Sequence, residues 1–244
     1  VHDFFNPDRV VIGGMSQEKI KKLEELYSTF DSEIIITDPI SSQLIKYLAN
    51  TYLPMRLSFV NEATRLADYS NANLQDVLKG VGLDSRIGSH YFRPSPSWGG
   101  SCFPKDLVEV NNFYKKDELN LPLISNIIES NDEHLEWTVN QLISLKQSNN
   151  LEKIYLVGAA FKENTDDLRN SPTLDIYKIL SKMKVEVIIL DQEIQVPEHI
   201  YISSINDIAP NSLVSIMYPQ KDEFSSKLND FCSQNNCVIY YPWS

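Results

Sequence analysis

The stretch from Ser41 to Ala72, SSQLIKYLANTYLPMRLSFVNEATRLADYSNA, is the longest helical pattern in the sequence. Apolar residues recur in it every three or four positions and form two stripes on different faces. One stripe is Ile45, Leu48, Tyr52, Met55, Phe59, Ala63 and Leu66, and the other is Leu53, Leu57, Val60 and Ala67. About 30 residues give a helix of roughly 45 Å, too long for the rest of this small segment to cover. We therefore expect a second copy of the chain to pack on it, as a homodimer through the 41–72 helix.

A polar pair interrupts this apolar element. Lys46 and Asn50 are four positions apart and so share one helix face. Pro54 would remove a backbone donor and clash with the carbonyl of Asn50, which predicts a bend at the pair. We expect the bend to aim both side chains at the cysteine loop described next. A solvated helix edge is the alternative.

The loop Trp98-Gly-Gly-Ser-Cys-Phe-Pro-Lys-Asp106 crowds a thiol, an amine and a carboxylate beside flexible backbone. Its two glycines allow the backbone to approach a ligand closely or to take a positive φ, and Pro104 suits the first turn of a following helix. Residues 85–105 contain no Asp or Glu but four basic side chains: Arg86, His90, Arg93 and Lys105. This balance predicts a cationic pocket that binds an anionic substrate and lowers the thiol pKa of Cys102. A buried structural cysteine is the alternative.

Length and composition indicate a globular chain with a substantial core. The sequence has 244 residues, of which 42% are hydrophobic and 23% charged. Acidic residues outnumber basic ones by 33 to 22, which argues against a nucleic-acid partner. No apolar run reaches membrane-spanning length, and the first residues do not resemble a signal peptide. We therefore expect a cytoplasmic protein with no membrane partner.

The cysteines and histidines indicate neither a disulfide framework nor a metal site. Three cysteines fit a reducing compartment, and Cys232 and Cys237 are expected to be structural because they flank a helix end and a strand start. The histidines show no paired spacing with Cys or Asp: His2, His90, His134 and His199. We predict no metal.

The N-terminal residues resemble the end of a larger domain. They predict a strand at 9–13, a helix at 17–30 and a strand at 33–37. These pieces cannot form a sheet domain alone, and the sequence does not begin with methionine. We therefore interpret residues 1–38 as the remnant of an N-terminal domain.

Helices are predicted to continue through residues 39–148. Asn73 caps a short helix that ends near Gly80 or Gly82, and two further helices are expected at 105–116 and 123–146. With the 41–72 helix, these segments predict an all-helical central domain.

Beyond a polar linker at residues 147–150, strands and helices alternate. Strands are predicted at 153–158, 185–191, 212–217 and 237–241, and helices at 171–183 and 221–234. Residues 149–244 are thus expected to form a small doubly wound parallel sheet, and the fold class is α/β. Ligands bind beyond the carboxyl ends of such strands, which places residues 158–169 at a binding edge. Lys162 and Arg169 are the cations available there for phosphates, and a solvated charged loop is the alternative.

Three stretches together resemble the UDP-glucose/GDP-mannose dehydrogenase family, and the resemblance covers essentially the whole chain. They are the helix Lys46-Tyr-Leu-Ala-Asn-Thr-Tyr-Leu with Phe59-Val-Asn-Glu62, the loop Gly99-Gly-Ser-Cys-Phe-Pro-Lys-Asp106, and Gly158-Ala-Ala-Phe-Lys-Glu-Asn-Thr-Asp-Asp-Leu-Arg-Asn-Ser-Pro172. The resemblance implies a central dimerisation domain and a C-terminal nucleotide-sugar-binding domain.

The resemblance also implies a four-electron oxidation of a sugar C6 alcohol to a carboxylate with two NAD. Cys102 would be the nucleophile that forms a thiohemiacetal and then a thioester. Lys46 and Asn50 match residues that stabilise oxyanion charge, and Asp106 matches an aspartate that handles water or protons.

The same resemblance implies the binding residues. Contacts to the sugar nucleotide are expected from Arg86, Tyr91, Arg93, Gly99, Lys105, Phe161 and Lys162. Arg86 matches an arginine that the family delivers across the dimer. Arg169 resembles the arginine that reaches the NAD pyrophosphate.

The sequence also departs from the family. No Gly-x-Gly-x-x-Gly occurs, so we expect the N-terminal Rossmann NAD-binding domain to be absent and this polypeptide alone to be inactive. The close, Tyr240-Tyr-Pro-Trp-Ser244, differs from the family's usual Asp-Gly-Arg-Asn and puts one substrate contact in doubt.

Several functions stay open. Ser85-Arg-Ile-Gly88 favours UDP-glucose, whereas Tyr91-Phe-Arg-Pro94 also suits GDP-mannose or another UDP-hexose. A hydrolase or acyltransferase could use the same thioester chemistry without NAD. A non-catalytic dimerisation and nucleotide-binding fragment is the remaining alternative.

Overall fold

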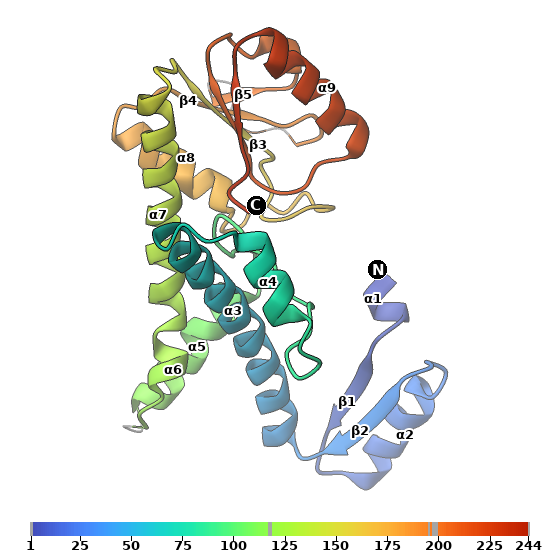
Figure 1. Ribbon diagram of the computed structural model, residues 1–244. Coiled ribbons are helices and arrows are strands. Elements are labelled where there is room, and N and C mark those ends of the chain that lie inside the picture. Colours follow the sequence, from blue (N-terminus) through green and yellow to red (C-terminus); the bar gives the residue numbers. More distant parts are fainter. Residues whose placement is uncertain (1, 117–118, 195, 197–199, 244) are drawn as a thin grey trace. The chain divides into compact units, whose positions relative to one another are not determined.

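The computed structural model describes residues 2–116, 119–194, 196 and 200–243 (Figure 1). The chain divides into two compact units, residues 1–52 and 53–244. The three predicted domains, with limits at 38/39 and 148/149, stay a prediction. His199 lies outside the described residues.

The first unit contains two paired strands and two helices before the long helix begins. α1 (His2–Phe5), β1 (Arg9–Gly13), α2 (Gln17–Tyr27) and β2 (Glu33–Thr37) follow in order, and the strands pair in parallel. Both strands agree with the sequence prediction. The helix ends at Tyr27 rather than residue 30, where the Ser28 and Thr29 hydroxyls bond back to carbonyls of the last turn.

The long helix α3 (Pro39–Tyr69) confirms the main prediction, with its ends shifted by two or three residues. Asp38 sets its start because one carboxylate oxygen accepts the N–H groups of Ile40 and Ser41, both at 2.9 Å. Asn71, with φ 52°, follows its end. The helix continues through Pro54.

The two apolar stripes of α3 differ in burial. In one stripe Val60 and Ala67 are 0% and 5% exposed, because they pack within the chain. In the other, Phe59 and Leu66 are 59% and 65% exposed. An exposed apolar face is what a homodimer would cover, and the homodimer itself stays a prediction.

Four further helices follow, and two predicted boundaries among them are wrong. They are α4 (Leu74–Gly82), α5 (Phe103–Lys116), α6 (Pro122–Ser125) and α7 (Ile127–Ser148). The predicted single helix at 123–146 is interrupted at Asn126, whose side chain bonds back to the Pro122 carbonyl at 2.6 Å. The linker was predicted to begin at residue 147, but α7 continues to Ser148. The chain leaves the helix at Asn150, which has a positive φ.

The C-terminal residues form the predicted doubly wound sheet. Its elements are β3 (Ile154–Val157), α8 (Pro172–Lys182), β4 (Val187–Leu190), β5 (Tyr201–Ile202), the 3-10 helix η2 (Ile205–Asp207), β6 (Leu213–Ile216), α9 (Asp222–Gln234) and β7 (Val238–Tyr240). The five strands are parallel, in the order β5-β4-β3-β6-β7. β5 was not predicted, because two residues are too short to show a period.

Helices α8 and α9 cover opposite faces of the sheet (Figure 1), and alternate residues of β3 pack on these two faces. Ile154 and Leu156 belong to the apolar cluster that contains residues of α7 and α8. Tyr155 and Val157 belong to the cluster on the other face, with residues of α9. β3 is therefore central and buried on both sides. Its carboxyl end leads directly into residues 158–171.

Within the described part of the chain, no helix is both long and apolar enough to cross a membrane.

Candidate functional site

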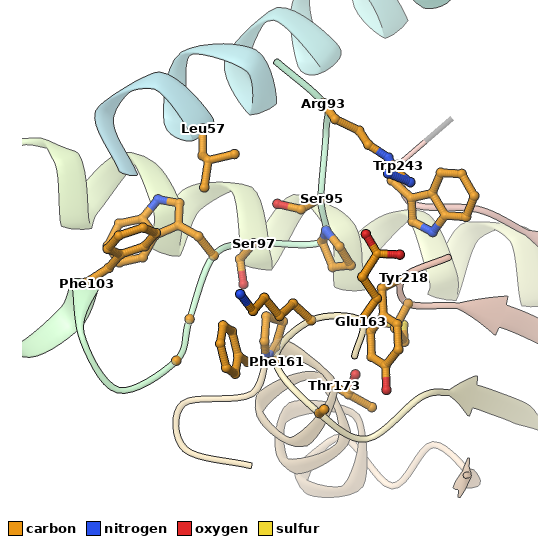
Figure 2. A pocket seen from close by; sticks show the side chains of 18 of the residues that line it. Leu57, Arg93, Ser95, Ser97, Phe103, Phe161, Glu163, Thr173, Tyr218 and Trp243 are labelled. Atoms are coloured by element: carbon orange, nitrogen blue, oxygen red, sulfur yellow. The ribbon is translucent and has the colours of Figure 1, made fainter. Parts of the chain in front are cut away.

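A pocket of about 430 Å³ lies between the loop after α4 and the carboxyl edge of the sheet (Figure 2). It is lined on one side by residues 91 and 93–103, which we call the helical wall, and on the other by residues 160–163, 172–173 and 217–219, which we call the sheet wall. Leu57 of α3 and Trp243 complete the lining. The loop that the sequence singled out thus faces the predicted binding edge.

Six of the twelve predicted site residues line this pocket: Tyr91, Arg93, Gly99, Cys102, Phe161 and Lys162. Arg86, Lys105, Asp106 and Arg169 lie elsewhere in the same unit. Lys46 and Asn50 belong to the first unit, so their approach to Cys102 stays a prediction. Of the four basic residues predicted for the pocket, Arg93 alone appears in its described lining. The sheet wall contributes one further cation, Lys162, and one anion, Glu163.

The helical wall is held by side chains from α3. The amide side chain of Asn61, which is fully buried, accepts the Ser95 N–H at 3.0 Å. Ser58, one turn earlier, accepts the indole N–H of Trp98 at 2.9 Å. Trp98 is 7% exposed and packs on Leu107 and Ile127. The loop therefore enters the site with the Ser95 backbone and the Trp98 side chain fixed by a distant helix.

Three polar side chains on one face of α7 complete this support. Asn131 accepts the Trp98 N–H at 2.8 Å and donates to the Trp98 carbonyl at 3.1 Å. The imidazole Nε2 of His134 lies 2.9 Å from the Ser95 carbonyl, and the Thr138 hydroxyl donates to the Pro96 carbonyl at 3.1 Å. These groups satisfy the buried backbone of a loop that has no regular secondary structure of its own.

His134 acts in this network as a neutral donor. Its side chain is fully buried, and burial lowers its pKa to about 4. Nε2 must carry the proton because it faces a carbonyl. Nδ1 is then an uncharged acceptor, buried with no hydrogen-bond partner among the residues that the structure describes. The ring stacks on Trp137 with centroids 5.2 Å apart.

The sheet wall is held mostly by its own neighbours in sequence. The Ser171 hydroxyl donates to the Ala159 carbonyl at 2.6 Å, and the Thr173 hydroxyl donates to the Gly158 carbonyl at 2.7 Å. Asp191, at the end of β4, accepts the Ala159 N–H at 2.8 Å. These bonds fold the segment after β3 back onto the start of α8.

Two glycines join the walls. A Cβ at Gly99 would lie 1.8 Å from the Asn170 carbonyl oxygen, so only glycine allows this approach. Gly100 has φ +86°, and its carbonyl accepts the Asn170 amide at 2.9 Å. A Cβ at Gly100 would lie 2.8 Å from the Phe161 ring. These glycines therefore let the loop approach Asn170 and Phe161 closely, and the predicted close approach to a ligand stays a prediction.

Cys102 follows these glycines and is exposed, which excludes the buried structural alternative for this residue. It immediately precedes α5, and its carbonyl accepts the Asp106 N–H at 3.1 Å. The positive end of a helix dipole favours a negative charge at this position. The Ser101 hydroxyl lies 3.7 Å from the sulfur, and Arg169 interacts electrostatically with Cys102. The thiol is thus accessible at the start of a helix, with the Ser101 hydroxyl as its polar neighbour.

The charged residues around this loop are paired. Lys105 Nζ lies 2.5 Å from the Asp106 carboxylate, which is buried while Lys105 is largely exposed. Arg86 bonds to Asp84 at 2.6 Å. Arg169 bonds to Asp167 at 2.8 Å, and this bond lowers the pKa of the Asp167 carboxyl to about 2.

The other two cysteines differ from Cys102. Cys232 lies in α9 and is 2% exposed, and Cys237 immediately precedes β7. Burial raises the pKa of the Cys232 thiol to about 12. Burial of Cys232 fits the predicted structural role, and the role of Cys237 stays a prediction.

Sequence reasoning missed several residues at this site. Tyr218, Glu163 and Trp243 line the pocket without having been predicted. Burial and the nearby Asp191 carboxylate raise the pKa of Tyr218 to about 12, so its hydroxyl stays protonated. The supporting residues Asn131, His134 and Thr138 did leave a signal, namely polar side chains at intervals of three and four on one face of a long helix.

A metal is not indicated by the side chains. Among the residues with described positions, no three His, Cys, Asp or Glu side chains gather closely enough to hold an ion. The prediction that the protein needs no metal stays a prediction.

Comparisons with known proteins point to one family. Residues 40–133 match the central domain of the UDP-glucose/GDP-mannose dehydrogenase family, and residues 155–240 match its UDP binding domain. UDP-glucose 6-dehydrogenases of Rickettsia felis and Bacillus subtilis are 35% and 36% identical over 191 and 198 residues, which are 77% and 81% of this chain. The chain spans 43% of the length of each of these relatives.

A solved structure gives the same indication. A UDP-glucose dehydrogenase from Pyrobaculum islandicum superimposes with a TM-score of 0.84 at 25% identity, over all of this chain and 60% of that one.

Proposed function

Because the chain belongs to the UDP-glucose/GDP-mannose dehydrogenase family, we propose that it is the nucleotide-sugar-binding and thiol-bearing part of a UDP-glucose 6-dehydrogenase. The proposed reaction is the four-electron oxidation of UDP-glucose to UDP-glucuronate in the cytoplasm. One observation carries the proposal: an exposed cysteine at the start of a helix lines a pocket that the UDP-binding domain completes.

Cys102 is suited to the covalent part of this reaction. Its thiolate adds to the C6 aldehyde, which forms a C–S bond, and the oxygen takes a proton to give a thiohemiacetal. Loss of the C6 hydride to the oxidant and of the hydroxyl proton to a base converts that adduct to a thioester. Water then adds to the acyl carbon, the C–S bond breaks, and carboxylate and free thiol are released. A thiolate can perform both roles because it adds to aldehydes and also leaves from acyl groups.

The residues present fit NAD only in part. When bound, NAD would accept one hydride in each of the two oxidation steps. Arg169 is an exposed cation beside Cys102 and could reach the pyrophosphate. The sequence holds no Gly-x-Gly-x-x-Gly turn, so in this proposal the rest of the dinucleotide site lies outside these 244 residues.

Polar residues are proposed to assist on both sides of the thiol. Lys46 and Asn50 would stabilise the developing oxyanion once the two units are arranged around substrate. Asp106 is buried in the first turn of α5 and paired with Lys105, and it would orient the hydrolytic water. Arg93 and Lys162, with Tyr91, Gly99, Phe161 and Lys105, would bind the sugar nucleotide.

Calorimetric titration of the chain tests this assignment. We expect UDP-glucose to bind and GDP-mannose to bind at least roughly tenfold more weakly, a difference of about 1.4 kcal/mol. Preference for GDP-mannose would identify the rival nucleotide sugar. Binding of neither would contradict the proposed function.

A homodimer through α3 is part of the proposal. Four large apolar residues of one stripe are about half exposed or more: Leu48, Tyr52, Phe59 and Leu66. Arg86, whose side chain is 87% exposed, would then exchange Asp84 for the sugar nucleotide of the partner subunit. This arrangement would supply an extra cation to the pocket.

Sedimentation velocity tests the dimer. We expect the wild type to sediment as a dimer and Leu66→Glu as a monomer, because the change places a charge in the apolar contact. Met183→Glu is the matched control, since Met183 is 53% exposed at the end of α8. A monomeric wild type, or a dimeric Leu66→Glu variant, would contradict the proposed interface.

A further inference from the structure

Arg93 and Trp243 meet at the end of the pocket opposite Leu57 and Phe103 (Figure 2). The guanidinium carbon of Arg93 lies 5.2 Å from the centroid of the Trp243 ring, within the range of a cation–π contact. Both residues also line a second cavity of about 380 Å³ beside α4. The pair therefore forms part of the partition between the two cavities.

Trp243 is a fixed part of this partition. Its indole N–H donates to the Ile216 carbonyl at 2.8 Å, at the carboxyl end of β6. The ring meets Tyr241 edge to face, with centroids 5.2 Å apart, and packs on the cluster between the sheet and α9. The indole is thus anchored to the sheet by a hydrogen bond and by packing.

Arg93, in contrast, is an exposed side chain on the loop. A long arginine side chain has many rotamers, and stacking on a rigid ring restricts them. A guanidinium held flat against an indole still has N–H groups at its edge, and these suit phosphate oxygens. The reacting end of the pocket is marked by Cys102, beside Phe103. The opposite end should therefore receive the nucleotide part of the ligand.

We infer that Trp243 is a positioning residue that holds Arg93 at the pocket rim to bind the diphosphate of the nucleotide sugar. The inference rests on the proposed function, because it takes a nucleoside diphosphate as the ligand. Trp243 acts through Arg93. The contribution of Trp243 to ligand binding should therefore vanish when the Arg93 guanidinium is removed.

Two substitutions of Trp243 test whether its aromatic face is what holds Arg93. Trp243→Phe and Trp243→Leu both lose the indole N–H donated to Ile216, but only Trp243→Phe keeps an aromatic face for Arg93. The measurement is the Kd of UDP for the 244-residue chain by calorimetric titration. We expect Trp243→Leu to weaken binding roughly three- to tenfold and Trp243→Phe by less than about twofold. Tyr241→Phe, which keeps its ring beside Trp243, is the control and should bind as the wild type does.

A double-mutant cycle with Arg93→Met separates positioning from direct contact. In the Arg93→Met background, Trp243→Leu should cause no further loss. An equal loss in both backgrounds would show that Trp243 contacts the ligand itself and would overturn the inference. Equal effects of Phe and Leu at position 243, or no effect of either, would also overturn it. A wild type that fails to bind UDP would instead refute the proposed function on which the inference rests.

Discussion

The helical wall and the sheet wall of the pocket are held in place in different ways. The helical wall is fixed by side chains 33 to 42 positions away in sequence, from α3 and α7. The sheet wall is fixed mostly by hydroxyls 12 to 15 positions away, at the start of α8. The cysteine therefore depends on tertiary packing for its position, whereas the opposite wall folds with its own sheet edge.

The largest effect is expected at Asn131. Asn131→Leu would leave both the N–H and the carbonyl of Trp98 unpaired in a buried site, at a cost of about 4 kcal/mol in the free energy of unfolding. Urea denaturation measures this loss. Asn140→Leu is the control on an exposed position of the same helix and should change stability by less than about 0.5 kcal/mol. Similar losses in the two variants would show that the helical wall does not depend on this contact.

The next effect depends on pH through His134. Its pKa is about 4 in the folded chain against the ordinary 6.5, so the unfolded chain binds the extra proton first as pH falls. This contribution to stability is complete above pH 6.5 and is lost as the pH falls through 4, by about 3 kcal/mol.

The measurement for His134 is the free energy of unfolding at a series of pH values. The difference between wild type and His134→Gln should shrink between pH 6.5 and 4. Asn140→Leu, which removes no titratable group from the same helix, should keep the pH dependence of the wild type. A constant difference for His134→Gln would mean that the imidazole is not held neutral beneath the loop.

A substitution at Gly99, where the two walls meet, should reduce the free energy of unfolding by less than the changes at Asn131 and His134. Gly99→Ala would place a Cβ 1.8 Å from the Asn170 carbonyl, and relief of that clash should cost about 2 kcal/mol and weaken UDP-glucose binding. Thermal unfolding and titration check the two effects. Gly80→Ala is the control, because Gly80 lies in α4 with no atom of the described residues within 4 Å of its added Cβ, and it should stabilise by about 0.5–1 kcal/mol. Normal stability and binding of Gly99→Ala would show that the loop does not approach Asn170 closely at this position.

The smallest effect is expected on the sheet wall. Ser171→Ala removes the hydroxyl that bonds to the Ala159 carbonyl and should cost about 1 kcal/mol. Ser181→Ala, exposed near the end of the same helix, should be neutral within about 0.5 kcal/mol. A loss at Ser171 as large as that at Asn131 would remove the difference between the two walls.

The comparison also explains what could be predicted from sequence. The strands, the long helix and the parallel sheet follow from local periodicity, and each was confirmed near its predicted residues. Cys102, Phe161 and Lys162 could be found because each lies in a compact motif. The residues that hold the loop, such as Asn61 and His134, could not be assigned because their partners are fixed only by how α3 and α7 pack. Trp243 was missed for the same reason, since nothing local pairs it with Arg93.

Alkylation of Cys102 by iodoacetamide, followed by peptide mass spectrometry, tests the central claim most directly. Because the thiol is proposed to lie in the nucleotide-sugar pocket, UDP-glucose at ten times its Kd should slow alkylation of Cys102 about tenfold. The rate at Cys237, outside the pocket, should stay unchanged. Alkylation of Cys102 at the same rate with and without bound UDP-glucose would contradict the account.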